Sequence, residues 1–326
     1  MNRRVTWFTK GMYVLDDNER LRSLIDELST LTTESAPDRG DLEGLPTADL
    51  VRLMNEEDQR VPAAVQEQSA HIADAVDAIT ERFRRGGRLI YLGAGTAGRM
   101  GILDASECPP TFGTDPGLVV ARIAGGETAI RAAVENAEDD TDAAAASLRE
   151  LALTSDDTVV GISASGRTPY VLGGLAYARS VGALTIAVAA NTGSAIGADA
   201  DIAIEVAVGP EFLAGSTRLK SGTAQKLVLN MLTTLSMMRL GKTHRGVMVD
   251  LQSTNEKLRA RSVRTIQQLA GVSVEEAVSA LAAADGSVKL ALLIVTTGVE
   301  ATDAAAALER TGGVLRDAIA LCAVAE

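Results

Sequence analysis

Two short loops rich in glycine and hydroxyl side chains are the segments of this sequence best suited to chemistry. The first is Gly93-Ala94-Gly95-Thr96-Ala97-Gly98 and the second is Ser163-Ala164-Ser165-Gly166-Arg167-Thr168. Glycine lets a backbone approach a ligand closely, and free N–H groups at the start of a helix bind anions. The two loops together predict a phosphate site built from Gly95, Thr96, Ser163, Ser165, Gly166 and Thr168.

Other phosphate-binding motifs fit these loops less well. Gly93, Gly95 and Gly98 have the G-x-G-x-x-G spacing of dinucleotide sites, but the next apolar run ends in glycines, and only Glu127 beyond it could bind a ribose. The second loop is not followed by a P-loop lysine, which disfavours nucleoside triphosphate hydrolysis. Either loop alone could be an ordinary helix cap, whereas the pair favours a sugar phosphate.

The elements that position the loops alternate between strand and helix. Helical patterns at residues 97–105, 129–135, 142–151 and 170–181 separate five short apolar runs, at 88–92, 118–123, 158–162, 184–188 and 202–206. This alternation predicts an α/β fold with a doubly wound, five-stranded parallel sheet of the flavodoxin-like kind. In such a sheet, ligands bind where the strands end, which is where both loops lie.

The flanking segments predict three regions. Residues 1–60 form an N-terminal arm with helical patterns at 21–31 and 48–55, and residues 61–245 form the sheet domain, which opens with a helix at 61–85 and ends with one at 220–240. Residues 246–326 are helical throughout and predict a C-terminal helical subdomain.

Composition limits the classes of function. The net charge of −12 disfavours nucleic-acid binding. Two cysteines, Cys108 and Cys322, are too few for a disulfide scaffold, and no signal peptide or membrane-spanning apolar run is evident. We therefore expect a soluble, cytoplasmic protein that binds neither nucleic acid nor membrane.

Carboxylates are the best candidates for acid–base catalysis. The two histidines, His71 and His244, lie outside the strand-end loops, and paired carboxyl groups can share acid and base roles. From the residues alone, Glu107 is most simply a solvated acid that the following Cys108-Pro109-Pro110 segment could shield, and Glu138 belongs to an acidic run that is typical of a solvated surface. Lys220, at the start of the long helix, fits a phosphate ligand or a surface lysine equally well.

Four further segments resemble one family of proteins. They are MNEED at 54–58, DASECPPTFG at 104–113, AEDD at 137–140 and GSTRLKSGTAQK at 215–226. With the two loops, which resemble sugar isomerase (SIS) domains in general, these segments are similar to N-acetylmuramic acid 6-phosphate etherases from about residue 47 to the C-terminus. The resemblance implies a lyase that cleaves the lactyl ether of its substrate in the recycling of cell-wall amino sugars.

The resemblance also implies a mechanism without metal or cofactor. The sugar opens, a base removes the proton at C2, an acid assists the departure of lactate, and water adds at C3. Glu107 is the implied acid and Glu138 the implied base, while Ser106 and Lys220 join the loops in binding the phosphorylated amino sugar. A homodimer with its sites near the subunit contact is also implied, and the apolar surface of the 220–240 helix agrees with it.

Two departures from the family pattern affect these expectations. Ala97 stands where the family usually has serine, which removes one hydroxyl from the first loop, and residues 33–37 match a Thr-Glu-x-x-Asn-Pro segment only loosely. Two other functions share the same fold: a non-catalytic sugar-phosphate sensor, and a phosphosugar isomerase or deaminase. A single SIS unit without an added DNA-binding segment argues against the sensor, and a lactate assay separates the etherase from the isomerase.

Overall fold

A five-stranded parallel sheet forms the centre of the computed structural model, which describes residues 17–37, 40–250 and 256–323. Its strands follow the order β2-β1-β3-β4-β5. They are β1 (Leu89–Gly93), β2 (Val119–Ile123), β3 (Thr158–Ser163), β4 (Leu184–Ala189) and β5 (Ile202–Glu205). All pairs are parallel, so the predicted fold class is confirmed.

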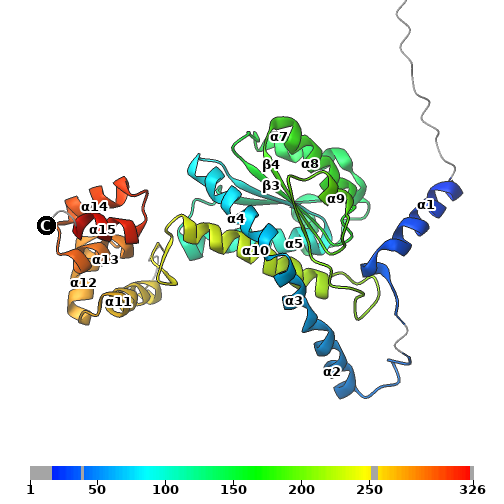
Figure 1. Ribbon diagram of the computed structural model, residues 1–326, viewed down its shortest axis with the longest axis horizontal. Helices are drawn as coiled ribbons and strands as arrows, with labels where there is room; N and C mark the ends of the chain where they lie inside the picture. The colour runs from blue at the N-terminus through cyan, green and yellow to red at the C-terminus, as the bar shows by residue number, and fades with distance from the viewer. Residues whose placement is uncertain (1–16, 38–39, 251–255, 324–326) are drawn as a thin grey trace, which may run out of the picture.

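Helices cover both faces of the sheet (Figure 1). One face packs against α4 (Ser69–Arg84), α5 (Gly95–Phe112) and α10 (Lys220–Arg239), and the other against α7 (Thr141–Glu150), α8 (Pro169–Val181) and the short α9 (Ala195–Ala198). Successive residues of β1 point to opposite faces, so Leu89 and Tyr91 join the first core and Ile90 and Leu92 the second. Because both sides are covered, β1, β3 and β4 are buried along their whole length.

Helix α5 is longer than predicted. The sequence suggests an end at Ala105, before Pro109 and Pro110, but the helix continues to Phe112 and ends at Gly113, which has a φ of 61°. A proline inside a helix costs about 3 kcal/mol. Cys108 and Phe112 are nevertheless buried in the same core as Ala105, at helical spacing, and this burial holds the extra turns. Glu107 is therefore a helix residue.

Two other predicted boundaries are displaced. The helix expected over 61–85 is divided into α3 (Arg60–Glu67) and α4 at Gln68, whose side chain accepts a hydrogen bond from the backbone N–H of Glu205 at 3.3 Å. The helix expected over 129–135 is α6 (Gly126–Arg131), and the chain is extended at Ala132. The segment beyond it is therefore free to form a loop.

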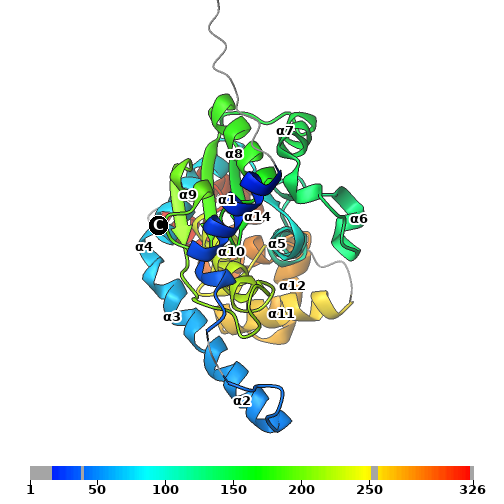
Figure 2. The ribbon, with the colours of Figure 1, turned by 90° about the vertical axis from the view of Figure 1, so that its right-hand side faces the viewer.

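The N-terminal region runs from the sheet edge to an outlying helix. Its elements are α1 (Asp17–Thr30), the single 3₁₀ turn η1 (Thr32–Glu34) and α2 (Thr47–Asp58). Helix α2 has no buried residue, and in two perpendicular views it projects away from the sheet domain (Figures 1 and 2). Residues 1–16 of the predicted arm lie outside the described residues.

The C-terminal helices form a body of their own beside the sheet (Figure 1). A hairpin of β6 (Thr243–His244) and β7 (Val247–Met248) leads to them. They are α11 (Glu256–Ala270), α12 (Val274–Ala283), α13 (Val288–Thr297), α14 (Ala301–Arg310) and α15 (Leu315–Ala323), which share one apolar core. Among the described residues, no single helix is long and apolar enough to cross a membrane, and α12 with α13 passes that test only as a pair bent by 116°.

Candidate active site

The two predicted loops lie on either side of the point where the strand order reverses. The chain leaves β1 toward β2 on one side, and β3 lies on the other side of β1. Helices α5 and α8, which follow β1 and β3, therefore begin next to each other at the carboxyl edge of the sheet. This is the ligand-binding position of doubly wound folds, and the starts of both helices offer N–H groups to an anion.

The first loop turns sharply from β1 into α5. Gly95 is exposed with a φ of 53°, which suits glycine, and Thr96 beside it is half-buried. A Cβ on Gly93 would lie 2.6 Å from the backbone nitrogen of Gly98, so that close approach requires glycine. Ala97, which replaces the family's usual serine, is 7% exposed and packs in the core.

The second loop is organised by hydrogen bonds between hydroxyls. The Ser163 hydroxyl is buried, shares a hydrogen bond of 2.8 Å with Thr168 and accepts one from the N–H of Gly166 at 3.0 Å. The Ser165 hydroxyl lies 3.3 Å from that of Ser163 and accepts from the N–H of Arg167 at 3.4 Å. Thr168 and Ser165 remain half-exposed, so the loop presents polar groups held in a fixed shape.

Glu138 and Asp140, two acids of the same run, have different surroundings. It lies in η2 (Ala137–Asp139), is exposed, and lines a cavity of about 220 Å³ together with Gly95, Arg99 and Glu135. Asp140, two residues on, is instead the N-cap of α7 and accepts two backbone N–H groups. Within this run the structure thus assigns a capping role to one acid and places Glu138 beside the first loop.

Arg99 is a positioning residue that no motif in the sequence indicates. From the second turn of α5 its guanidinium donates to the carbonyl oxygens of Ala129 at 2.7 Å, Ile130 at 3.0 Å and Ala132 at 3.4 Å. These contacts hold the end of α6 against the start of α5. The chain that continues toward Glu138 is therefore tied to the first loop.

Glu107 lies far from Glu138 within one chain. It is exposed on α5, twelve residues beyond Gly95, which is about 18 Å along a helix. The expected shielding of Glu107 by the prolines is wrong, because this side chain faces outward. Ser106 is also exposed and donates to the carbonyl of Leu103 at 2.9 Å. It lines a separate hollow along the edge strand β2.

Lys220 is one of the most deeply buried side chains, so its reading as a surface lysine is wrong. It is 1% exposed, and its ammonium lies 2.9 Å from the Oε2 atom of Glu57 on α2. Glu211, also buried, accepts hydrogen bonds from the N–H groups of Lys220 and Ser221 at the start of α10. A Cβ on Gly222 would lie 3.3 Å from Thr96, so this helix start borders the first loop.

Asn191 joins the N-terminal region to the sheet edge. Its Oδ1 atom accepts from the N–H and the hydroxyl of Thr32, both at 2.9 Å, and its Nδ2 atom donates to Thr33 and to the carbonyl of Ala164. A cavity of about 390 Å³ lies here, lined by Thr32, Ser165 and Asn191 among others. Although residues 33–37 match the family pattern loosely, this segment lies against the second loop.

Other titratable groups near the site have structural surroundings. Burial and the nearby Asp104 raise the pKa of Cys108 to about 12, which keeps the thiol protonated, and the side chain packs in the core. Burial also raises the pKa of Asp104, although that carboxylate accepts from Tyr91, Asn230 and Thr233. Among the described residues, no group of three His, Cys, Asp or Glu side chains is placed to hold a metal ion.

A flavodoxin-like sheet with hydroxyl loops and helix starts around its reversal point is the architecture of an SIS domain. The SIS family model matches residues 134–235, and the model of the glucokinase regulatory protein N-terminal SIS domain matches residues 71–179. Among solved structures, a phosphoheptose isomerase from Francisella tularensis covers 60% of this chain and 100% of its own, with 20% identity and a TM-score of 0.48.

Full-length relatives define the family more narrowly. An N-acetylmuramic acid 6-phosphate etherase from Streptomyces avermitilis is 56% identical over 92% of this chain and 96% of its own length. Etherases from Streptomyces coelicolor and Brucella anthropi are 56% and 54% identical, each over 91% of this chain and over 96% and 97% of their own lengths. The chain belongs to the N-acetylmuramic acid 6-phosphate etherase family.

Proposed function

We propose that this protein cleaves the lactyl ether of N-acetylmuramic acid 6-phosphate, releasing D-lactate and N-acetylglucosamine 6-phosphate. The family membership supports the reaction. The observation that carries the assignment of the site is that Glu138 lines the same cavity as Gly95 of the first loop. A carboxylate is thereby next to the helix start that would bind the substrate's phosphate.

In this proposal the phosphate end of the sugar is held by the two loops. The N–H groups at the starts of α5 and α8 and the hydroxyls of Thr96, Ser165 and Thr168 supply donors to a phosphate dianion. In this proposal Lys220 does not contact the phosphate itself, because its ammonium is paired with Glu57. Its part is to fix the start of α10 beside Thr96.

The chemical steps require one base and one acid. With the sugar opened to its aldehyde, Glu138 removes the proton at C2, and the electron pair forms a C2–C3 double bond. The C3–O bond breaks, its electrons pass to the lactate oxygen, and Glu107 supplies the proton that the oxygen takes. Water then adds across the double bond, with hydroxyl at C3 and a proton at C2. The sum is one ether and one water converted to two alcohols.

The two glutamates meet in this scheme only if Glu107 comes from a second copy of the chain. Along α5, Glu107 is about 18 Å beyond Gly95, whereas Glu138 is beside Gly95. We therefore propose a homodimer in which Glu107 of one copy completes the cavity of the other. The site is then shared, and neither copy carries a complete set of groups.

An apolar surface beside Glu107 supports this dimer. Leu103, one helical turn before Glu107 on α5, is 47% exposed, and Met231 and Leu235 on α10 are 36% and 39% exposed. Helices α5 and α10 are locked side by side by the hydrogen bonds from Asn230 and Thr233 to Asp104. Exposed apolar patches of this kind mark contact surfaces, and a two-fold dimer would present each Glu107 to its neighbour.

Two measurements test the proposal. The first is release of D-lactate from N-acetylmuramic acid 6-phosphate, and no release by the intact protein would defeat the etherase assignment. The second mixes Glu107→Gln and Glu138→Gln chains, each expected to be nearly inactive, by co-expression.

In the shared-site dimer, a mixed pair has one intact site, so random pairing restores roughly a quarter of wild-type activity. If both glutamates acted within one chain, mixing would restore nothing. That outcome would reject the shared site and leave the reaction itself in place. We also propose that the enzyme acts in the cytoplasm, which its two free cysteines suit.

A further inference from the structure

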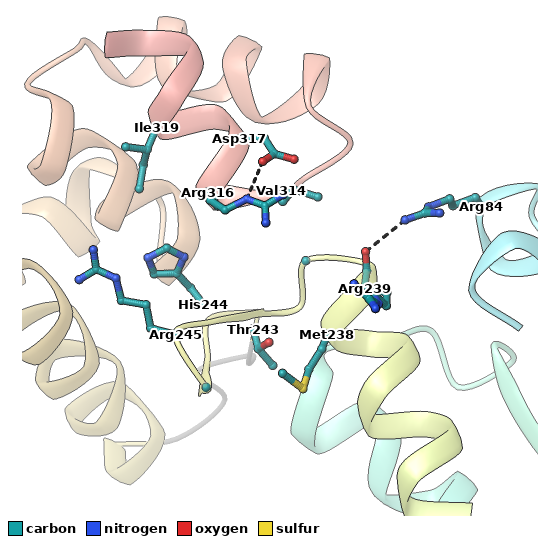
Figure 3. A pocket seen from close by; sticks show the side chains of 12 residues that line it. Arg84, Met238, Arg239, Thr243, His244, Arg245, Val314, Arg316, Asp317 and Ile319 are labelled. Carbon is teal, nitrogen blue, oxygen red and sulfur yellow. Dashed lines mark hydrogen bonds and ion pairs between the residues drawn. The ribbon is translucent and has the colours of Figure 1, made fainter. Parts of the chain in front are cut away.

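A second hollow lies between the sheet domain and the C-terminal helices, far from the loops described above. Its volume is about 630 Å³, and it lies among the ends of α4 and α10, the β6–β7 hairpin and the start of α15. This junction cavity contains the side chains of Arg84, Arg239, Arg245, Arg316, His244 and Asp317 (Figure 3). It is at the opposite end of α10 from Thr96, and a 20-residue helix is about 30 Å long.

The junction cavity is cationic although the whole chain carries a net charge of −12. Four guanidinium groups line it against one carboxylate, Asp317. Arg84 and Arg239 have only loose, exposed ion pairs, at 3.7 and 3.9 Å. Arg245 has no ion pair or hydrogen bond to any residue in the described part of the chain. Such a concentration of positive charge attracts anions.

Two of these cations occupy positions that their local structure disfavours. Arg245 has a φ of 49° in the hairpin turn, a left-handed conformation uncommon for residues other than glycine, asparagine and aspartate. Arg316 lies in the first turn of α15, where the helix dipole disfavours positive charge. Residues held in uncommon backbone conformations cluster at ligand-binding and active sites. Asp317 pairs with Arg316 at 2.8 Å and leaves the other three without a carboxylate from the cavity wall.

The walls of the junction cavity are held in place by an ion-pair network. Lys242, just before the hairpin, and Lys289 on α13 both bind the Oδ2 atom of Asp250, at 2.7 and 3.1 Å. Lys289 is 7% exposed. On the other side, a Cβ on Gly241 would lie 2.9 Å from the Cα atom of Val314. These contacts join the hairpin to the C-terminal helices and fix the spacing of the arginines.

We propose that the junction cavity binds a small phosphorylated metabolite at a site separate from the sheet-edge site. The planar guanidinium fork matches phosphate oxygens in bidentate geometry. Figure 3 shows Arg245 at one end of the hollow and Arg84 and Arg239 at the other, with His244 and Arg316 between them. The volume suits a molecule of sugar-phosphate or nucleotide size, and Met238, Val314 and Ile319 supply apolar wall for its uncharged part.

The test is calorimetric titration of inorganic pyrophosphate into four proteins. They are the wild type, Arg245→Gln with Arg316→Gln, Ser165→Ala in the second loop, and Arg310→Gln, a matched loss of charge on the exposed end of α14. We expect the double variant to bind pyrophosphate at least about tenfold more weakly than the wild type, because two charge-assisted contacts are lost. The Arg310→Gln protein should bind it as the wild type does, and the Ser165→Ala protein, altered in the sheet-edge site, should keep the binding event that the double variant loses.

Arg245→Gly separates binding from folding. Glycine accepts the left-handed turn, so this variant should unfold at the same or a higher temperature than the wild type while still losing affinity for pyrophosphate. The proposal is overturned if the wild type does not bind pyrophosphate at millimolar concentration, if all variants bind equally, or if binding is lost in Ser165→Ala alone. The last result would assign the anion to the sheet-edge site.

Discussion

The ammonium of Lys220 and the carboxylate of Glu57 form an ion pair of 2.9 Å although the two residues are 163 positions apart. Lys220 is almost completely buried, and the Glu57 side chain is 16% exposed. This pair connects the outlying helix α2 to the start of α10, next to the first loop. The N-terminal region is thereby coupled to the geometry of the candidate active site.

Removing one partner of this pair should destabilise the protein. Glu57→Gln leaves a buried ammonium without its counter-charge, and we expect a loss of about 3 kcal/mol in the free energy of unfolding. The control is Glu56→Gln, which breaks an exposed pair with Arg52 and should cost less than about 1 kcal/mol. Urea denaturation of both variants measures the difference, and equal losses would contradict the importance of the buried pair.

The roles of the two glutamates can be separated by isotope exchange. In D₂O, N-acetylglucosamine 6-phosphate should exchange its C2 proton with any variant that keeps the base, as followed by proton NMR. Glu107→Gln should retain this exchange while losing lactate release by a factor of about 100 or more, and Glu138→Gln should lose both. Glu135→Gln, in the same cavity as Glu138, is the matched control and should keep both activities. If Glu107→Gln lost the exchange and Glu138→Gln kept it, the roles of base and acid would be exchanged between the two glutamates.

Arg99 should affect turnover through the position of Glu138. Arg99→Met removes the donors that bind three carbonyl groups at the end of α6, and we expect kcat to fall about tenfold with a smaller change in KM, because the base is displaced. Arg99→Lys, which keeps one donor group, should recover part of the loss. Arg131→Met, an exposed residue of α6, is the control. A KM effect with unchanged kcat would indicate a role in binding instead.

The dimer prediction rests on the exposed apolar side chains of α10. Met231→Glu with Leu235→Glu would place like charges opposite each other across a two-fold contact. We expect a monomer by light scattering and at least a tenfold loss of activity. Val274→Glu, at an apolar position of α12 that is 47% exposed, should leave both the oligomeric state and the activity unchanged. A fully active monomer would reject the shared site.

Asp157 should make stability depend on pH in the acid range. Burial opposes its charge, but hydrogen bonds from the Arg88 guanidinium and from the N–H groups of Thr154 and Arg88 outweigh that effect and lower the pKa of Asp157 below its ordinary 3.8. The folded state therefore binds fewer protons, so this stabilisation is complete above about pH 5 and is lost as the pH falls through the folded-state pKa.

Comparing the wild type with Asp157→Asn at several pH values tests this. The difference in unfolding free energy should be about 2 kcal/mol at pH 7 and should shrink below pH 4. Asp156→Asn, whose carboxylate is half-exposed and pairs with Arg85, should show a smaller difference. If the difference in unfolding free energy between the wild type and Asp157→Asn stayed constant down to pH 2, the pKa of Asp157 would not be lowered in the folded state.

The sequence predicted the sheet well because strands buried on both faces appear as continuous apolar runs. Each expected strand agrees with the observed one to within a residue at either end. The end of α5 was missed because local rules stop a helix before Pro109, whereas burial of Phe112 against the sheet core extends it. That burial depends on the tertiary structure, which the local pattern does not contain.

The candidate site was predicted unevenly for a similar reason. Hydroxyl loops at strand ends are local signals, so Gly95 and Ser165 could be found from spacing. Glu138 could be chosen from its acidic run only through the family resemblance, because Glu135 of the same run lines the same cavity. The burial of Lys220 could not be predicted at all, since its partner Glu57 is distant in sequence.

One helix, α5, begins at the first loop and carries Glu107 three turns later. In the proposed dimer, the first turn of α5 contributes to the site of its own copy and the fourth turn contributes to the site of the neighbour. Dilution should then inactivate the enzyme without unfolding it. Below the dissociation constant of the dimer, the turnover rate per chain should fall in proportion to the protein concentration. The cellular concentration of the protein would then determine the fraction of chains that are active.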